Sequence, residues 1–265
     1  MSVHPLWLVL LGWAATALMM VTLWFLQRVR GNAATADVGW CFGFALVAIG
    51  YALAAQGDPE RRLLVACLPA IYAFRLGLHV LMDRVFGKPE DGRYRSLRGK
   101  WGSQAQLYFF VYFQGQALAI VVFSLPLLVL MYNPRPTFSL WELAGIAVWL
   151  IAVVGEAVAD RQLARFRANP NNRGKTCREG LWRYSRHPNY FFESLHWWAY
   201  VVMGIGVPNG WITLIGPVLM TVALLKISGI PLAEAQALAS RGEDYRKYQR
   251  TTSAFIPWFP KEEGR

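Results

Sequence analysis

The chain has 265 residues, of which 55% are hydrophobic, 14% are aromatic and only 16% are charged, and its formal net charge is +11. This balance differs from that of a typical soluble domain and indicates an integral membrane protein. The positive charge does not indicate nucleic-acid binding, because no recognition module accompanies it and because membrane topology and anionic headgroups require the same excess.

Seven segments are apolar and long enough to cross a bilayer, for which roughly 20 residues are required. In chain order they are residues 4–27, 38–55, 63–82, 107–132, 139–159, 189–206 and 211–230. The first is expected to be a membrane helix rather than a cleaved signal peptide, because no positive region precedes it. We therefore predict an all-α integral membrane protein with seven transmembrane helices, formed by residues 1–265 as a single domain.

Most of the 27 Lys and Arg residues lie in the connections that follow the first, third, fifth and seventh of these segments. Basic loops stay on the cytoplasmic side, so the N-terminus is expected outside and the C-terminus in the cytoplasm. The cytoplasmic connections at 83–106 and 161–188 are too long for tight turns, and loops of this length are usually functional or disordered.

Polar side chains occur near the cytoplasmic ends of most of the predicted spans. They are Asp37 in the second, Tyr72, Arg75, His79 and Asp83 on one face of the third, Gln114 and Gln116 in the fourth, Glu156 and Asp160 in the fifth, Asn189, Glu193 and His196 on one face of the sixth, and Lys226 in the seventh. A charge that faces lipid is costly, so these groups are expected to face inward. They would form structural ion pairs, such as Arg75 with Glu193, or line a polar cavity.

A ring of basic residues is expected at the mouth of such a cavity. Its members are Arg165, Arg167, Arg173, Lys175, Arg178, Arg183 and Arg186. This ring would match a phosphate-bearing ligand from the cytoplasm, and the apolar deeper end would suit a hydrophobic substrate from the bilayer. The sequence has neither a Gly-x-Gly-x-x-Gly turn nor a Walker loop, so a nucleotide site would be of another kind. Its His and Cys residues lack metal-ligand spacing, and no metal is expected.

Two C-terminal stretches carry a family resemblance. Residues 180–193, GLWRYSRHPNYFFE, and residues 244–257, DYRKYQRTTSAFIP, resemble the C-terminal signature of the steroid 5-alpha-reductase family, especially that of its bacterial membrane homologues. The resemblance is strongest over about 156–258, and residues 37–40 and 90–94 also look like the bacterial homologues.

The resemblance implies NADPH as cofactor and reduction of the carbon–carbon double bond of a 3-oxo-delta-4 steroid or a similar lipid-like enone, by hydride transfer to the β carbon. Tyr72 looks like the family tyrosine that hydrogen-bonds the substrate carbonyl, and Asp37 is expected to replace the carboxylate paired with it. Both would stabilise charge that develops on the carbonyl oxygen, with Asp37 kept as a neutral acid by apolar surroundings. The expected cofactor-binding residues are Arg75, His79, Asp83, Arg84, Glu156, Asp160, Arg167, Lys175, Tyr184, His187, Asn189 and Glu193.

Some positions allow a second interpretation or depart from the family. His187 could simply order the turn before Pro188. Glu156 stands where eukaryotic members have Asn, His79 where they have Tyr, and Phe192 where a Gly commonly precedes the Glu. Phe192 could narrow the pocket and change the range of substrates. Glu234 and Gln236 align with the family only across a gap, and neither receives a role.

Two other classes of protein remain open. Integral-membrane methyltransferases of the isoprenylcysteine or phospholipid type, which use S-adenosylmethionine, also carry an Arg-His-Pro turn but typically continue with Tyr-x-Gly and a late Glu-Glu pair. The pair Asn189 and Glu193 favours the reductase. A non-catalytic lipid-binding or transport protein would leave the basic ring without a ligand. We expect a bacterial inner-membrane protein whose cofactor site faces the cytoplasm, with membrane lipid and a hydrophobic substrate as partners and no obligate protein partner.

Overall fold

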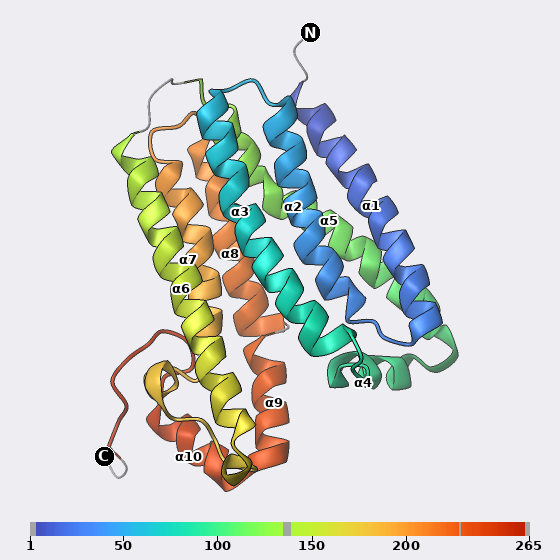
Figure 1. Cartoon of the computed structure of the whole chain (residues 1–265), viewed down its shortest axis with the longest axis vertical. Coiled ribbons are helices and arrows are strands. Elements are labelled where there is room, and N and C mark those ends of the chain that lie inside the picture. The colour runs from blue at the N-terminus through green and yellow to red at the C-terminus, as the bar shows by residue number, and fades with distance from the viewer. Residues whose placement is uncertain (1–3, 135–138, 228, 263–265) are drawn as a thin grey trace. The chain divides into compact units, whose positions relative to one another are not determined.

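The structure is a computed structural model that describes residues 4–134, 139–227 and 229–262, and it contains helices and no strand within these residues (Figure 1). The chain divides into two compact units. Unit 1 comprises Met1–Phe138 and Gly206–Ile215, and unit 2 comprises Ser139–Ile205 and Gly216–Arg265. The all-α prediction is confirmed for the described residues, whereas the prediction of a single domain stays a prediction.

Unit 1 is built from long helices that follow one another along the chain. They are α1 (Pro5–Arg30), α2 (Thr35–Ala54), α3 (Pro59–Val80) with its π-helical extension η1 (Leu81–Val85), α4 (Gly92–Trp101), the short turn η2 (Gly102–Gln104), α5 (Ala105–Met131) and the separate turn η5 (Gly210–Leu214). Two aspartates start helices here: Asp58 accepts from the Arg61 N–H at α3, and Asp91 accepts from the Arg93 N–H at α4. These side chains satisfy N–H groups that a helix start leaves unpaired.

Unit 2 centres on two helices that pack along their lengths, α6 (Leu140–Ala168) and α7 (Pro188–Met203). It also contains η3 (Pro170–Asn172), η4 (Gly180–Arg183), α8 (Ile215–Val222), η6 (Ala223–Ile227), α9 (Ile230–Arg241) and α10 (Glu243–Thr251). A capping box of Ser139 and Glu142 starts α6. Small residues bring α6 close to α7, because a Cβ on Gly145 would lie 2.8 Å from the Ala199 carbonyl oxygen.

Six helical segments are long and apolar enough to cross a membrane, counted over the described residues. They are Pro5–Arg30, Thr35–Ala54, Pro59–Val85, Gly92–Met131, Leu140–Ala168 and Gly210–Arg241. The predicted segment 189–206 is helical as α7, but its 16 residues extend only about 24 Å against a hydrocarbon core of about 30 Å. The chain is therefore a multi-pass membrane protein, and the count of seven membrane helices stays a prediction. Residue 228 of the predicted last span lies outside the described residues.

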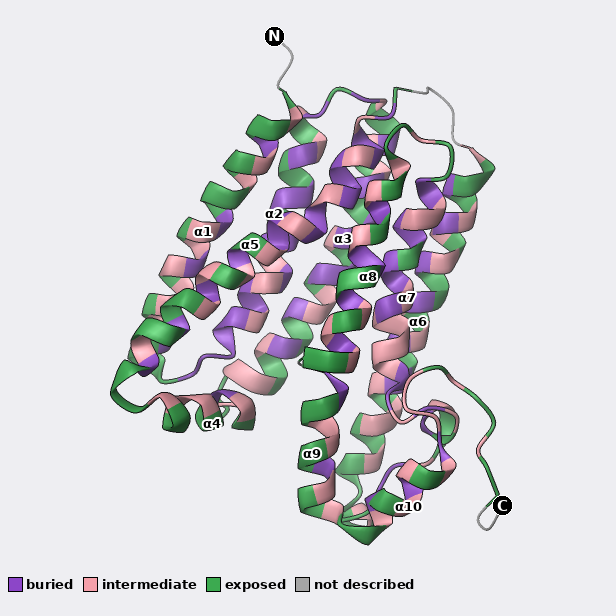
Figure 2. Ribbon diagram, turned by 180° about the vertical axis from the view of Figure 1, so that it is seen from behind, coloured by how far each residue is buried: buried purple, intermediate pink, exposed green. Residues whose placement is uncertain are grey.

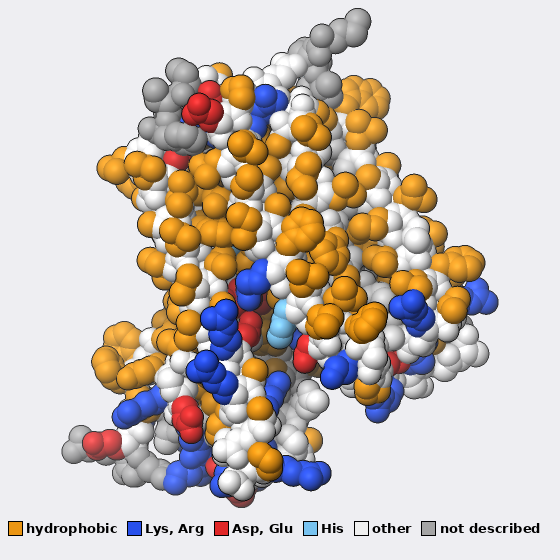
Figure 3. All heavy atoms as spheres, in the orientation of Figure 1, with side chains coloured by type: hydrophobic (Ala, Val, Ile, Leu, Met, Phe, Trp, Pro, Cys, Tyr) orange, Lys and Arg blue, Asp and Glu red, His pale blue; other side chains and the backbone are white. Residues whose placement is uncertain are grey.

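Burial within each unit fits a lipid environment. Apolar side chains on the outer faces of the helices are exposed, among them Leu18 and Leu53, whereas the inner faces are buried (Figure 2). Lys and Arg side chains gather near α4 in unit 1 and near α9 and α10 in unit 2 (Figure 3). Apolar surface of this extent on a monomer indicates contact with lipid or with another protein.

Candidate functional site

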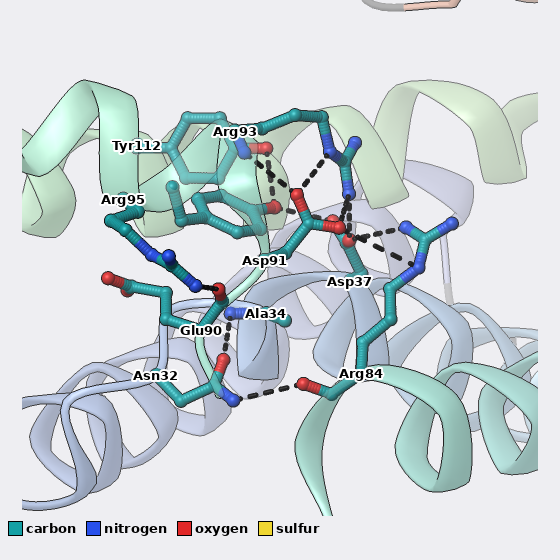
Figure 4. A network of polar contacts seen from close by, with 10 residues as sticks. Asn32, Ala34, Asp37, Arg84, Glu90, Asp91, Arg93, Arg95 and Tyr112 are labelled. Carbon is teal, nitrogen blue, oxygen red and sulfur yellow. Dashed lines mark hydrogen bonds and ion pairs between the residues drawn. The ribbon is translucent and has the colours of Figure 1, made fainter. Parts of the chain in front are cut away.

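In unit 1, polar contacts gather around Asp37 in the first turn of α2 (Figure 4). Arg93 donates from Nη2 to Asp37 Oδ2 at 2.9 Å, and Arg84 donates from Nη1 to the same oxygen at 3.4 Å. The hydroxyl of Tyr94 donates to Asp37 Oδ1 at 2.6 Å and lies 3.2 Å from the hydroxyl of Tyr112. These five residues and Asp91 form what we call the Asp37 cluster.

The loop before α4 also contacts the Asp37 cluster. Asp91 Oδ1 accepts from the backbone N–H of Arg93 at 2.9 Å and from its Nε at 3.1 Å. Burial alone would raise the pKa of the Asp91 carboxyl, but these hydrogen bonds and the positive charges of Arg93 and Arg84 outweigh burial and lower it. Glu90 accepts from Arg98 and from the Ala33 N–H, so the loop is joined to the turn between α1 and α2.

The surroundings of Asp37 differ from those expected. Two guanidinium groups and a phenol donate to its carboxylate, so its neighbours are polar and charged rather than apolar, and it acts as an acceptor rather than as the expected proton donor. The difference arises because Arg93 and Tyr94 reach Asp37 from a helix more than 50 positions away along the chain. No periodicity within α2 could reveal this contact.

Asp37 and Tyr72 are not brought together. A Cβ on Gly77 would lie 3.1 Å from the Cβ of Cys41, so these two positions of α3 and α2 are level. Asp37 precedes Cys41 by one turn, and Tyr72 precedes Gly77 on the antiparallel helix, so the two are separated by roughly 13 Å along the helix axes. Tyr72 is buried, and its ring faces the Arg75 guanidinium at 5.5 Å. His79 and Asp83, expected on the same face of α3, are exposed.

In unit 2, a hydrogen bond that the sequence did not predict joins α6 and α7. Asn189 donates from Nδ2 to Asp160 Oδ1 at 3.3 Å, which joins the first turn of α7 to α6. The other amide atom, Asn189 Oδ1, is buried and has no hydrogen-bond partner. Glu156 and Glu193 lie one helical turn from this pair on their own helices; Glu156 is buried and Glu193 is half-buried.

Phe192 has a packing partner in the same unit. A Cβ added to Gly155 of α6 would lie 2.4 Å from the Phe192 ring. The ring therefore occupies the notch that the missing side chain leaves on α6. This contact explains how α7 accommodates a large residue where the family commonly has Gly.

The Arg-His-Pro turn at residues 186–188 contacts other residues of unit 2. Arg186 donates from Nε to Glu234 Oε1 at 2.7 Å, and His187 Nε2 lies 3.3 Å from the same oxygen. Gln249 donates to Glu234 Oε2 at 2.7 Å, and the Tyr245 hydroxyl donates to Oε1 at 3.3 Å. We call these five residues the Glu234 cluster; its contacts fit the interpretation that His187 orders the turn before α7.

The remaining predicted residues lie in the last turn of α6 and in the loop between α6 and α7. Arg167 and Lys175 are exposed, and Tyr184 is half-buried with its ring 5.9 Å from that of Phe259. Sequence reasoning missed Arg93, Tyr94, Tyr112, Tyr245 and Gln249 as parts of polar clusters. The resemblances noted at 90–94 and 244–257 cover all of them except Tyr112, but they gave none of these residues a role. In the described part of the chain, no group of His, Cys, Asp and Glu is arranged to hold a metal ion.

A known protein family matches most of this chain. Residues 23–252 match the family described as "Protein of unknown function (DUF1295)". An uncharacterized protein of Schizosaccharomyces pombe is 24% identical over 208 residues, which cover 69% of this chain. The aligned part spans only 60% of that relative. No solved structure matches the chain.

Proposed function

The chain belongs to the family described as "Protein of unknown function (DUF1295)", which includes steroid 5-alpha-reductase-like membrane proteins, and from this premise we propose that it is an NADPH-dependent reductase of a lipid-like enone. The observation that carries the proposal is the buried, unpartnered Oδ1 of Asn189 beside Asp160. A buried acceptor without a donor is costly in a folded protein, and a ligand with an N–H group would satisfy it.

The donors and acceptors of unit 2 fit the chemistry of NADPH. Its carboxamide can donate to Asn189 Oδ1, and its ribose hydroxyls can donate to carboxylates such as Asp160 and Glu193. Arg167 in the last turn of α6 and Lys175 in the loop that follows are exposed cations and suit its phosphates. We propose these residues, with Glu156 and Tyr184, as the cofactor-binding set of unit 2. That Arg75, His79, Asp83 and Arg84 of unit 1 and His187 of unit 2 also contact the cofactor stays a prediction from the resemblance.

When bound, NADPH would supply the hydride that adds to the β carbon of the enone, and water would supply the proton that the neighbouring α carbon takes up. We propose that Tyr72 donates its hydroxyl proton in a hydrogen bond to the substrate carbonyl and so stabilises the charge that develops there. Burial of Tyr72 excludes water from this donor. Because Asp37 accepts from Arg84, Arg93 and Tyr94, we assign it a positioning role, in which it holds the loop before α4.

The proposal includes seven membrane helices, an outside N-terminus and a cytoplasmic C-terminus in a bacterial inner membrane. The basic connections then face the cytoplasm, where NADPH is found, and the substrate enters from the bilayer. A 3-oxo-delta-4 steroid is the reference substrate of this class.

Ligand-dependent stabilisation tests the cofactor. The full chain in detergent is heated with NADPH, NADH or S-adenosylmethionine, and only the true cofactor should raise the apparent melting temperature through preferential binding to the native state. We expect the largest shift with NADPH. A shift with S-adenosylmethionine and none with NADPH would support the methyltransferase class instead.

Variants locate the site. Asn189→Ala should weaken NADPH binding about tenfold, because it removes a buried amide contact. Asn171→Ala is the matched control, since Asn171 is an exposed asparagine of the same unit. Tyr72→Phe should leave the NADPH shift intact and lower kcat for a test enone by about 100-fold. Wild-type turnover in Tyr72→Phe would remove Tyr72 from the mechanism.

A further inference from the structure

The end of unit 2 is a non-helical segment, residues 253–261, that is held against the loop before α7. The Trp258 N–H donates to the Tyr184 carbonyl at 2.9 Å, and the Lys261 N–H donates to the Thr251 carbonyl at 2.8 Å. At the other end of the segment, Ser185 Oγ donates to the Phe255 carbonyl at 2.8 Å. These backbone contacts fix the position from which the side chains of the segment project.

A basic pocket of about 440 Å³ lies beside this segment. Its described lining consists of Arg178, Arg183, Thr251, Thr252, Pro260 and Lys261. Arg178 is paired with Asp244 at 2.8 Å, so Arg183 and Lys261 carry the uncompensated charge. No carboxylate belongs to this lining, and two threonines supply hydroxyls. Such a lining is suited to an anion with several acceptor oxygens, such as a phosphate.

The carbonyls at the end of α10 do not oppose an anion there. Arg186 Nη1 donates to the carbonyls of Gln249 at 2.9 Å and Thr252 at 2.7 Å. The Thr251 carbonyl accepts from the Lys261 N–H. The negative end of this helix is thus largely capped.

Large apolar side chains project from the same segment. Ile256, Trp258 and Phe259 are 61%, 70% and 75% exposed. Figure 3 shows hydrophobic and basic side chains side by side over this part of unit 2. The Phe255 ring contacts that of Phe191 in the first turn of α7, with centroids 5.9 Å apart, so the segment lies level with the start of an apolar helix.

Exposed aromatics next to cations, level with the start of an apolar helix, are typical of the membrane interface. We propose that the pocket binds the phosphate of an anionic phospholipid headgroup, with Trp258 and Phe259 inserted among the adjoining lipids. Arg183, Lys261 and the two threonines hold the phosphate, and the aromatic side chains select a phosphate that is attached to a lipid. None of the six lining residues belongs to the proposed NADPH set, so loss of phospholipid binding and loss of NADPH binding can be measured separately.

The test uses the full chain in detergent and three probes: dioctanoylphosphatidylglycerol, dioctanoylphosphatidylcholine and inorganic phosphate. Phosphatidylglycerol should raise the apparent melting temperature in a saturable manner, and the other two should not at equal concentration. Arg183→Ala and Lys261→Ala should each weaken phosphatidylglycerol binding about tenfold, and Lys261→Arg should retain it. Lys100→Ala removes the same charge from an exposed position of α4 and should bind like the wild type.

Other results would overturn the proposal. An equal shift with inorganic phosphate would make this a site for free phosphate, and an equal shift with phosphatidylcholine would remove the role of charge. Unchanged phosphatidylglycerol binding in both alanine variants would exclude the pocket, as would a loss in Lys100→Ala as large as theirs. Lys261 is exposed in the terminal segment, so Lys261→Ala keeps the test valid if Arg183→Ala fails to fold.

Discussion

The Asp37 cluster of unit 1 and the Glu234 cluster of unit 2 have similar chemistry but different burial. In both, one carboxylate accepts from arginine and tyrosine and ties a loop to a helix. The side chains of Arg84 and Arg93 are 38% and 34% exposed, whereas that of Arg186 is only 11% exposed. The Glu234 cluster is therefore expected to act as a structural core of its unit, and the Asp37 cluster as a peripheral anchor for a loop.

A motif that is conspicuous in the sequence need not be a ligand site. The Arg-His-Pro turn stands out in the sequence, yet its Arg186 and His187 contact Glu234 of the same unit. Asn189, two positions after His187, keeps a buried acceptor that no described group satisfies. The residue with unused hydrogen-bonding capacity is the better candidate for a ligand contact.

Removing the Glu234 carboxylate should give the largest loss of stability. Glu234→Ala leaves Arg186 mostly buried without its anion, which should cost about 3 kcal/mol in the free energy of unfolding. Denaturant unfolding in detergent, followed by tryptophan fluorescence, measures the change. Glu179→Ala, which removes an exposed carboxylate of the same unit, is the control. Equal stability of the two variants would refute the core role.

Removing the Asp37 carboxylate should cost less, about 1.5 kcal/mol, because both of its arginines can turn toward water. The same unfolding measurement applies, with Asp83→Ala as the control for an exposed carboxylate in unit 1. A loss greater than that of Glu234→Ala would reverse the comparison between the two clusters.

The packing of Phe192 against Gly155 of α6 gives a prediction with a smaller expected effect, which does not involve either cluster. Gly155→Ala places a methyl group against the Phe192 ring and should destabilise unit 2 by about 1 kcal/mol. Phe192→Leu in the same chain should recover most of this loss, because the shorter side chain leaves room for the methyl group. Additive losses in the double variant would mean that the two residues do not compete for the notch.

The smallest expected effect is on the way stability depends on pH. Burial alone would raise the pKa of Asp244, but the hydrogen bond from the Thr176 N–H and the charge of Arg178 lower it. A carboxyl whose pKa is lower in the folded state adds stability above its unfolded pKa of about 4, and this contribution is lost as pH falls through the folded pKa. Asp244→Asn should therefore reduce stability at pH 7 by about 0.5 kcal/mol, because the pair is partly exposed, and should reduce the acid sensitivity. Melting temperatures of the wild type and the variant at pH 7 and pH 3 check both expectations. If the fall in melting temperature from pH 7 to pH 3 is the same in the two proteins, Asp244 does not contribute to the acid sensitivity.

The sequence by itself determined where most membrane helices lie, because long apolar runs are local features that the bilayer requires. It also placed Asp160 near the end of one predicted span and Asn189 at the start of the next, but not the hydrogen bond between them. The shorter extent of α7 depended on where the chain leaves the helix after Met203.

Only the tertiary structure decided the partners of Asp37, Glu234 and Phe192. Arg93 reaches Asp37 across 56 positions, and Arg186 reaches Glu234 across 48. Such pairs follow from the packing of helices and loops rather than from any spacing along one element. The same physics explains why Asp37 was expected in apolar surroundings: a helix sequence shows which of its residues share a face, but not which distant side chains will meet that face.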